Sequence, residues 1–226
     1  MTALEKYISE YGVGFDFKPV EKISYELHGA KISLDVMLFQ DLSNRRQKAT
    51  AVIEKNGNKY ECELVDVHDW RRVFSFIALN GKSYFCFRKT LYGFTLLNAD
   101  TLVEEYDYFP ENVIDGGESF IIVGVGAFGD IIIFDGCYWA FPYGWFAYDH
   151  TQKKFLNLND EYGIYNNDKT EINGDTLRLI GTDEAFKPVE STATLDEIRC
   201  LLEEKGRSGF YDDMCGFCDT KNSLDD

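Results

Sequence analysis

The hydrophobic pattern of residues 22–97 is that of a β-sheet. Short runs of β-branched and aromatic residues follow one another, in the order KISYEL, KISLDVMLF, KATAVIEK, NKYECELVDV, RVFSFIAL, KSYFCFR and YGFTLL. Two of the junctions are Asn56-Gly57 and Asn80-Gly81, the dipeptide that a two-residue hairpin turn with positive φ favours. Neighbouring runs should therefore pair with each other. The pattern predicts an antiparallel sheet, with apolar and polar residues alternating between a packed and a wet face.

A second series of strands is expected after Pro110. It comprises SFIIVGV, DIIIFDG, CYWAFPYG, WFAYDH and KKFLNL, and DTLRLIGT is the last strand of the chain. FIIV and DIIIF are continuous apolar runs, which are typical of strands covered on both faces. Residues 158–175 are rich in Asn, Asp, Gly and Tyr, and we expect them to form a long surface loop.

Three segments have apolar residues at helical intervals instead. They are residues 2–11, 99–106 and 194–205, and Gly12 and Gly206 are expected to end the first and the third. The fold class predicted is therefore α+β and β-rich. It has mostly antiparallel sheet, with short helices at the N-terminus, near 99–106 and near 194–205.

Charge is divided unevenly along the chain. The 226 residues include 23 Lys and Arg against 39 Asp and Glu, a net charge of −16. Residues 1–90 hold 14 bases and 12 acids, a balance of +2, which leaves −18 for residues 91–226. Residues 91–150 contain ten acids, fifteen aromatic residues and no Lys or Arg. We therefore expect an N-terminal helix and antiparallel β region (1–90), an acidic β-rich region (91–207) and an acidic C-terminal tail (208–226).

This composition excludes several classes of protein. Nucleic-acid binding is not expected, because neutralising phosphates requires clustered cations. No apolar run is long enough to span a membrane, and the start MTALEKYISEYG lacks the features of an export signal. We therefore expect a cytoplasmic protein with reduced cysteines. Cys215 and Cys218 form a C-x-x-C downstream of Cys200, but a zinc site needs a fourth ligand, so incidental cysteines are favoured over a metal. No cofactor is expected.

One glycine pattern matches a nucleotide-binding motif. Gly124, Gly126 and Gly129 satisfy G-x-G-x-x-G after a strand-like run. A dinucleotide site needs a helix next, because the helix N-terminus holds the pyrophosphate, whereas the strand sequence DIIIF follows here. We expect a glycine-rich bend between two strands.

Catalytic constellations are not evident either. The three histidines are well separated, and the acid beside two of them would point to the opposite face of a strand. Asp130 and Asp135, or Glu104 and Asp107, could form the carboxylate pair of a glycosidase-like hydrolase if a cleft held them about 5 to 10 Å apart. That hydrolase is the alternative to our expectation that the chain is not an enzyme.

The base-free segment is the favoured functional surface. Seven aromatic residues fall within residues 138–148, too many for one sheet face to bury, so some should be exposed. Exposed rings beside carboxylates are typical of protein-binding surfaces, where rings anchor the contact and acids steer a basic partner. The residues expected to bind such a partner are Glu118, Asp130, Asp135 and Asp149 for the electrostatic part, and Tyr143, Trp145 and Tyr148 as anchors. The alternative is a large core with ordinary solvated acids.

The same segment resembles a known family. The tripeptide FPE at residues 109–111 and the strands at 120–124 and 129–135 are similar to the core of the SUKH superfamily, and YGFTLLNADTLVEEY is similar to the segment leading into it. The resemblance covers roughly residues 91–150. Bacterial members are commonly immunity proteins for secreted toxins. The resemblance implies a protein that binds and neutralises a toxin without catalysis; a generic intracellular adaptor is the alternative.

Overall fold

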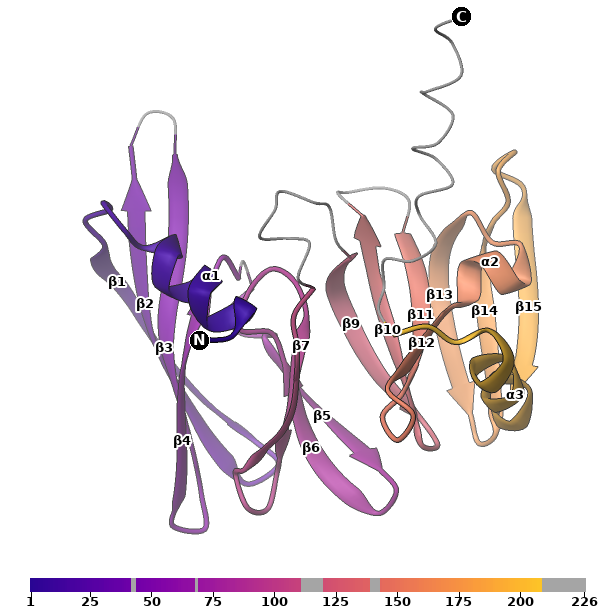
Figure 1. Cartoon of the computed structure of the whole chain (residues 1–226), viewed down its shortest axis with the longest axis horizontal. Helices are drawn as coiled ribbons and strands as arrows, with labels where there is room; N and C mark the ends of the chain where they lie inside the picture. Colours follow the sequence, from indigo (N-terminus) through magenta and orange to yellow (C-terminus); the bar gives the residue numbers. More distant parts are fainter. Residues whose placement is uncertain (42–43, 68, 111–119, 139–142, 209–226) are drawn as a thin grey trace, which may run out of the picture. The chain divides into compact units, whose positions relative to one another are not determined.

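The chain has two compact units in the computed structural model shown in Figure 1, unit 1 (Met1–Gly117) and unit 2 (Glu118–Asp226). Within the part of the chain that is described, fifteen strands form four antiparallel sheets, accompanied by three short helices. The β-rich α+β class expected from the sequence is therefore confirmed. The structure describes residues 1–41, 44–67, 69–110, 120–138 and 143–208.

The first sheet of unit 1 is a meander in the order β1-β2-β3-β4. Asn56 and Gly57 have φ angles of 51° and 83°, which confirms the expected turn between its last two strands. Ile32, Leu34 and Val36 are buried and alternate with more exposed residues of β2, so one face of the sheet packs into a core. The strands are β1 (Lys18–Leu27), β2 (Ala30–Gln40), β3 (Arg45–Lys55) and β4 (Asn58–Val65).

The second sheet of unit 1 has the order β5-β6-β7-β8. Asn80 and Gly81 have φ angles of 51° and 74° and form the second expected turn. The strands are β5 (Phe74–Leu79), β6 (Lys82–Phe87), β7 (Phe94–Asn98) and β8 (Glu104–Tyr108). Both sheets contribute to one buried cluster, which includes Ile32, Ile53, Leu64, Phe85, Phe87 and Leu97.

Helix α1 (Ala3–Tyr11) precedes the sheets, as predicted. The Glu5 backbone N–H donates to Thr2 Oγ1 at 3.1 Å, and the Thr2 backbone N–H donates to Glu5 Oε2 at 2.7 Å. This reciprocal capping box satisfies donors that the first turn of a helix leaves unpaired. The helix lies against β4.

The helix predicted at residues 99–106 is wrong. Asn98 ends β7, and its Oδ1 accepts hydrogen bonds from the backbone N–H groups of Asp100 (3.0 Å) and Thr101 (3.1 Å). This side chain thus gives the backbone a turn in place of a helix. Leu102 has a φ of 54°, which a right-handed helix does not allow. β8 follows at once and pairs with β7.

Unit 2 combines a four-stranded sheet, in the order β12-β11-β10-β9, with a three-stranded sheet, in the order β13-β14-β15. Residues 131–134 of β10 are consecutive and all buried, which confirms the prediction that both faces of this strand are covered. The same prediction for FIIV, at the start of β9, is wrong, because Val123 is 55% exposed. The strands are β9 (Phe120–Phe128), β10 (Ile131–Tyr138), β11 (Tyr143–Asp149), β12 (Lys154–Asn157), β13 (Asn166–Asn173), β14 (Thr176–Thr182) and β15 (Pro188–Thr194).

Two expectations for unit 2 are wrong. Residues 158–175 are not a loop, because they contain helix α2 (Leu158–Tyr162) and strand β13. DTLRLIGT is β14, and it is followed by the further strand β15. Both missed strands are polar edge strands that flank β14. Their strand conformation comes from pairing with β14, which a local hydrophobic pattern does not reveal.

Helix α3 (Leu195–Lys205) confirms the third helix prediction. The Glu197 backbone N–H donates to Thr194 Oγ1 at 3.2 Å, and the Thr194 N–H donates to Glu197 Oε2 at 2.7 Å, a second capping box. Ile198 and Leu202 are fully buried and belong to a cluster that also draws on β10, β11 and β14. Helix α3 therefore covers part of the core of unit 2.

The glycine-rich bend expected between two strands is confirmed for Gly129 only. Gly124 and Gly126 lie within β9, and Gly129 lies in the turn to β10 with a φ of 62°. A Cβ on Gly129 would lie 2.4 Å from Leu195 Cδ2. Gly129 is therefore required both by its backbone conformation and by the close approach of α3.

The boundary between the units differs from the one expected at residue 90. β7 and β8 belong to the acidic part of the sequence, but they complete the sheet that β5 and β6 begin. Nearly all of the expected tail at 208–226 lies outside the described residues. None of the described helices is long and apolar enough to cross a membrane.

Candidate protein-binding surface

The carboxylates of the base-free segment are paired with cations from other parts of the chain. Five of the ten acids in residues 91–150 form such ion pairs: Asp100 with Lys55, Glu104 and Asp107 with Lys89, Glu105 with Lys82, and Asp130 with Arg199. Four cations thus face five carboxylates. The segment is base-free in sequence, but five of its seven described acids lie beside a cation, and the other two, Asp135 and Asp149, accept hydrogen bonds from uncharged groups. Glu111, Asp115 and Glu118 lie outside the described residues.

Lys89 holds two of these carboxylates. Its Nζ lies 2.7 Å from Glu104 Oε2 and 3.0 Å from Asp107 Oδ2, and its side chain is 13% exposed. Tyr60 donates a hydrogen bond to Glu104 at 2.6 Å, and Thr95 donates one to Asp107 at 2.7 Å. Burial lowers the pKa of Lys89, but its hydrogen bonds and charge interactions with the two carboxylates outweigh burial and hold that pKa above its usual value.

This cluster brings together one carboxylate pair considered for hydrolysis. A glycosidase pair needs one protonated carboxyl group as general acid. Glu104 and Asp107 instead share the ammonium group of Lys89. Cys62 lines a surface groove together with Lys89 and Glu104. Burial raises the pKa of the Cys62 thiol to about 12, which disfavours a thiolate. The arrangement is that of a structural ion cluster.

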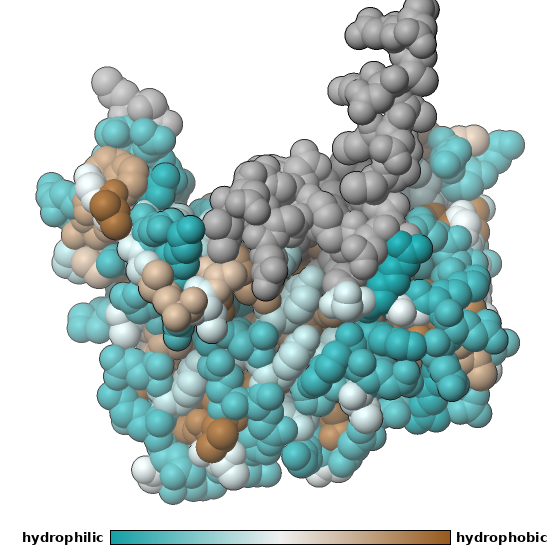
Figure 2. Space-filling model, in the orientation of Figure 1, coloured by the Kyte–Doolittle hydropathy of each residue, from teal (hydrophilic) through white to brown (hydrophobic). Residues whose placement is uncertain are grey.

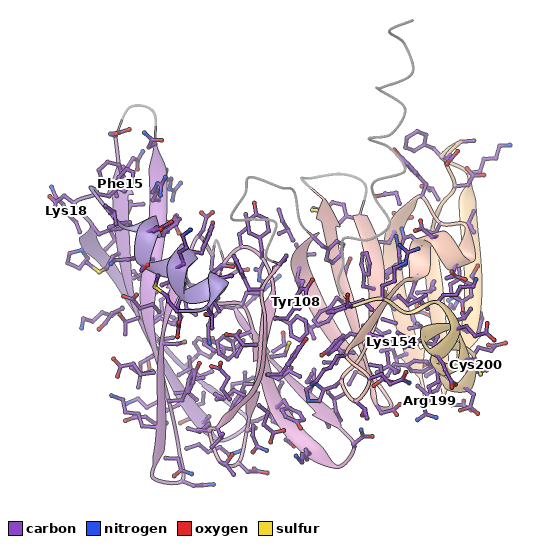
Figure 3. The ribbon with its side chains drawn as sticks, viewed as in Figure 1. Phe15, Lys18, Tyr108, Lys154, Arg199 and Cys200 are labelled. Carbon is purple, nitrogen blue, oxygen red and sulfur yellow. The ribbon has the colours of Figure 1, made fainter. Side chains whose placement is uncertain are left out.

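Asp130, one member of the second carboxylate pair, is held by helix α3. Arg199 donates from Nη2 at 2.8 Å and from Nε at 3.0 Å, both to Asp130 Oδ1; Figure 3 shows Arg199 on α3. Asp130 lies in the turn before β10, and Asp135 is five residues further along the strand. That spacing corresponds to roughly 16 Å along a strand. Asp130 and Asp135 therefore do not form a catalytic pair.

Asp135 is half-buried between strands of unit 2. It accepts a hydrogen bond from Asn167 Nδ2 at 2.5 Å. Burial raises the pKa of the Asp135 carboxyl group, against the opposing effect of hydrogen bonds from Asn167 and the Gly136 backbone. Asp135 is thus part of the packing between β10 and β13. It does not have the solvated position expected of a steering charge.

Asp149, also expected to contact the partner, is buried with 8% exposure. Its Oδ1 accepts hydrogen bonds from the backbone N–H groups of Thr151 at 2.7 Å and Gln152 at 3.0 Å. These bonds are typical of an Asx turn, so Asp149 shapes the connection from β11 to β12.

The aromatic anchors expected in β11 are mostly buried. Trp145 is 1% exposed and packs in the core of unit 2, and Tyr148 is 0% exposed. Tyr143 is 37% exposed. The expectation that Trp145 and Tyr148 are solvent-exposed is wrong, because residues 145–149 of β11 are consecutive and all buried, so both faces of the strand are covered there. Glu118, residues 139–142 and the Tyr138 side chain lie outside the described part of the chain.

The described histidines contact a ring or a lysine, and the described cysteines are not disulfide-bonded. His28 stacks on Phe76, with 3.6 Å between ring centroids, and His150 Nδ1 lies 3.0 Å from Lys153 Nζ. Cys200 is exposed. Among the residues described, no cluster of three or more His, Cys, Asp or Glu could hold a metal ion. His68, Cys215 and Cys218 lie outside those residues.

An aromatic and cationic surface lies in unit 1, at the end of the sheet where β1 begins and the β2–β3 hairpin turns. The rings of Phe15 and Phe39 are 4.8 Å apart. The Arg46 guanidinium carbon lies 4.2 Å from the Phe15 centroid, and Lys48 Nζ lies 5.0 Å from the Phe17 centroid. We define the ring–cation surface as Val13, Phe15, Phe17, Val20, Phe39, Arg46 and Lys48.

Two exposed valines flank these rings in sequence. Val13 is 70% exposed and Val20 is 55% exposed. Val20 is the extra residue of a β-bulge in β1, between Pro19 and Glu21, and has no cross-strand partner in β2. Its side chain therefore does not follow the usual alternation between the two faces of the sheet. Figure 3 shows Phe15 and Lys18 at this end of unit 1, and Figure 2 shows apolar atoms gathered there.

The sequence analysis missed this surface. Phe15 and Phe17 come from the connection after α1, whereas Phe39 and Arg46 are cross-strand partners in β2 and β3. The local signal is the spacing of Phe15 and Phe17 just before β1. Their meeting with the hairpin depends on strand register, which the sequence pattern does not reveal.

Comparison of the chain with protein-family models, with curated proteins and with solved structures finds no match. The resemblance of residues 91–150 to the SUKH superfamily therefore stays a prediction.

Proposed function

We propose that this chain is a non-catalytic protein-binding module that contacts its partner through the ring–cation surface. The observation that carries the proposal is a ring cluster held by cations, flanked in sequence by two exposed valines. Arginine and aromatic rings are enriched where protein interfaces gain most of their energy. Exposed aliphatic side chains next to them supply apolar area that a partner would remove from water.

The rings are held in place before any partner arrives. Arg46 Nη1 donates a hydrogen bond to the Tyr11 carbonyl at 2.8 Å, and its guanidinium lies over the rings of both Tyr11 and Phe15. Tyr11 is itself 8% exposed at the end of α1. A partner that binds rings already restrained in this way loses little side-chain entropy on binding.

Immunity to a basic toxin is the more specific form of this proposal. It rests on the resemblance of residues 91–150 to the SUKH superfamily and on the negative charge of that segment. The ion pairs and turn contacts of Asp130 and Asp149 reduce the support for electrostatic steering by those acids. We therefore assign the main contact to unit 1. A generic adaptor would use the same surface.

The hydrolase alternative has less support. The Glu104–Asp107 pair is bridged by Lys89, and Asp130 and Asp135 are separated along β10. The first pair therefore holds a cation between its carboxylates, and the second pair is separated by more than the about 5 to 10 Å that glycoside hydrolysis requires.

Site-specific photo-crosslinking in the native host tests the proposal. A photoreactive residue replaces Val13 or Val20, and Val103 provides a matched control because it is 58% exposed in the same unit. We expect a discrete protein adduct from positions 13 and 20 and none from position 103. Val20→Asp should weaken capture through position 13 by at least about tenfold, the equivalent of about 1.4 kcal/mol.

A photoreactive residue at a fourth position, Tyr143, distinguishes the ring–cation surface from the base-free segment. Tyr143 is the exposed member of the anchors expected in the base-free segment. An adduct from position 143, with none from 13 or 20, would contradict the assignment to unit 1 and support the base-free segment.

A further inference from the structure

Edge strands are protected in the described sheets, with one exception. An edge strand presents unpaired backbone groups, and proteins guard such edges with charges, prolines or bulges. β5, with the sequence FSFIAL, has no charged residue, no proline and no register shift. The other seven described edges are guarded as follows: β1 by Pro19 and Lys22, β4 by Lys59 and Glu61, β8 by Glu104 and Asp107, β9 by the extra residue Val123, β12 by Lys154, β13 by Lys169 and Glu171, and β15 by Pro188 and Glu190.

The outer edge of β5 can be worked out from its turn. β5 and β6 are joined by two residues, so Leu79 and Lys82 exchange backbone hydrogen bonds and every second pair along the hairpin does the same. Phe74, Phe76 and Ala78 belong to the intervening pairs and direct their N–H and C=O groups away from β6. Within the described part of the chain, no backbone hydrogen bond outside the β5–β6 ladder involves these residues.

We propose that β5 pairs antiparallel with β5 of a second copy of this chain, around a two-fold axis at Phe76. Phe76 then faces Phe76 of the other copy, and Phe74 faces Ala78. All three residues with outward backbone groups lie in hydrogen-bonded pairs in this register. A ring opposite a ring is a favourable cross-strand pair, and Phe74 opposite Ala78 places a large side chain beside a small one. The two β5–β8 sheets become one continuous sheet.

The β5 edge is where two copies can approach with the least repulsion, and its register is self-complementary. The chain carries −16, so two copies repel each other over much of their surfaces. The β5 edge brings no charged side chain of one strand opposite another. In the two-fold arrangement the β5 edges of both copies pair with each other. Among the described sheets no other unprotected edge remains, so association stops at the dimer.

Analytical ultracentrifugation of the full chain tests the proposal, from about 1 μM to about 1 mM to span weak and moderate affinities. We expect a reversible monomer–dimer equilibrium. Ala78→Pro removes one outward N–H without removing a bond to β6, and should raise the dimer dissociation constant at least about tenfold. Ala78→Val keeps that N–H and is the matched control, for which we expect dimerisation within about twofold of the original chain.

Two further measurements keep the test decisive if Ala78→Pro does not fold. Ala78 is exposed, so Ala78→Lys should preserve the fold, checked by circular dichroism, while introducing charge at the edge and weakening the dimer. In the original chain, the Phe76 and Ala78 amides should exchange hydrogen more slowly at high concentration. Three results would overturn the proposal: a monomer at every concentration tested, a dimer dissociation constant that Ala78→Lys leaves unchanged, or assemblies larger than a dimer. Each of these outcomes is independent of crosslinking at the ring–cation surface.

Discussion

Replacing Lys89 with methionine tests whether the acids of the base-free segment depend on cations from elsewhere in the chain. Methionine keeps a flexible apolar stem of similar length and removes the charge. Glu104 and Asp107 would lose the ammonium group they share and would be left as neighbouring carboxylates. We therefore expect Lys89→Met to destabilise unit 1.

The magnitude follows from the exposure of the three groups. Breaking a buried ion pair costs about 3 to 5 kcal/mol, whereas an exposed pair contributes about 0 to 1 kcal/mol. Lys89 is 13% exposed, but Glu104 and Asp107 are 32% and 27% exposed, so water screens part of the interaction. We expect a loss of about 2 kcal/mol in the free energy of unfolding. The folded state raises the pKa of Lys89, so this stabilisation is complete at pH 7 and is lost only as the pH rises through the folded pKa.

Urea unfolding at pH 7, followed by circular dichroism, measures this loss. Lys82→Met is the matched control, because Lys82 pairs with Glu105 on the same strand but is 59% exposed. The control should cost less than about 1 kcal/mol. Equal losses for the two variants, or a loss below about 0.5 kcal/mol for Lys89→Met, would refute the reasoning.

Two other substitutions probe unit 2. Asp135→Asn should raise Tm at pH 7, because burial disfavours the charged carboxyl group and raises its pKa in the folded state. The gain in Tm should shrink as the pH falls through that pKa and wild-type Asp135 becomes protonated, so a gain that persists at pH 3 in thermal melts would contradict this explanation. Gly129→Ala should lower the free energy of unfolding in urea by about 2 to 4 kcal/mol, because it combines a φ of 62° with a clash against Leu195. Gly174→Ala, at a φ of 64° with open space around it, should lower it by only about 1 kcal/mol, and equal losses for the two variants would contradict the clash.

The candidate binding surface could not be found from sequence. The aromatic residues near Trp145 are dense because residues 145–149 of β11 are buried on both faces of the strand, and not because they form an exposed surface. Burial of Trp145 and Tyr148 depends on what packs against each face, and strand alternation alone does not specify that. The exposed grouping around Phe15 and Phe39 arises because a connection and a hairpin, distant in sequence, meet at one end of a sheet.

Local chemistry determined most of the strands and the ends of two helices. The two Asn-Gly turns formed because these residues tolerate positive φ, and α3 begins at the capping box of Thr194 and Glu197, as their spacing indicates. These features need only interactions between residues close in sequence. The polar strands β13 and β15 were missed because their conformation depends on hydrogen bonds to β14.

Tertiary structure alone decided which acids of the acidic segment are paired with cations. In sequence, residues 91–150 carry ten acids and no base. In the fold, Lys89 precedes the segment and reaches Glu104, while Arg199 returns from α3 to Asp130. Coulomb interactions depend on distance in space and not on distance along the chain, so a charge balance counted by sequence region does not give the charge of a surface.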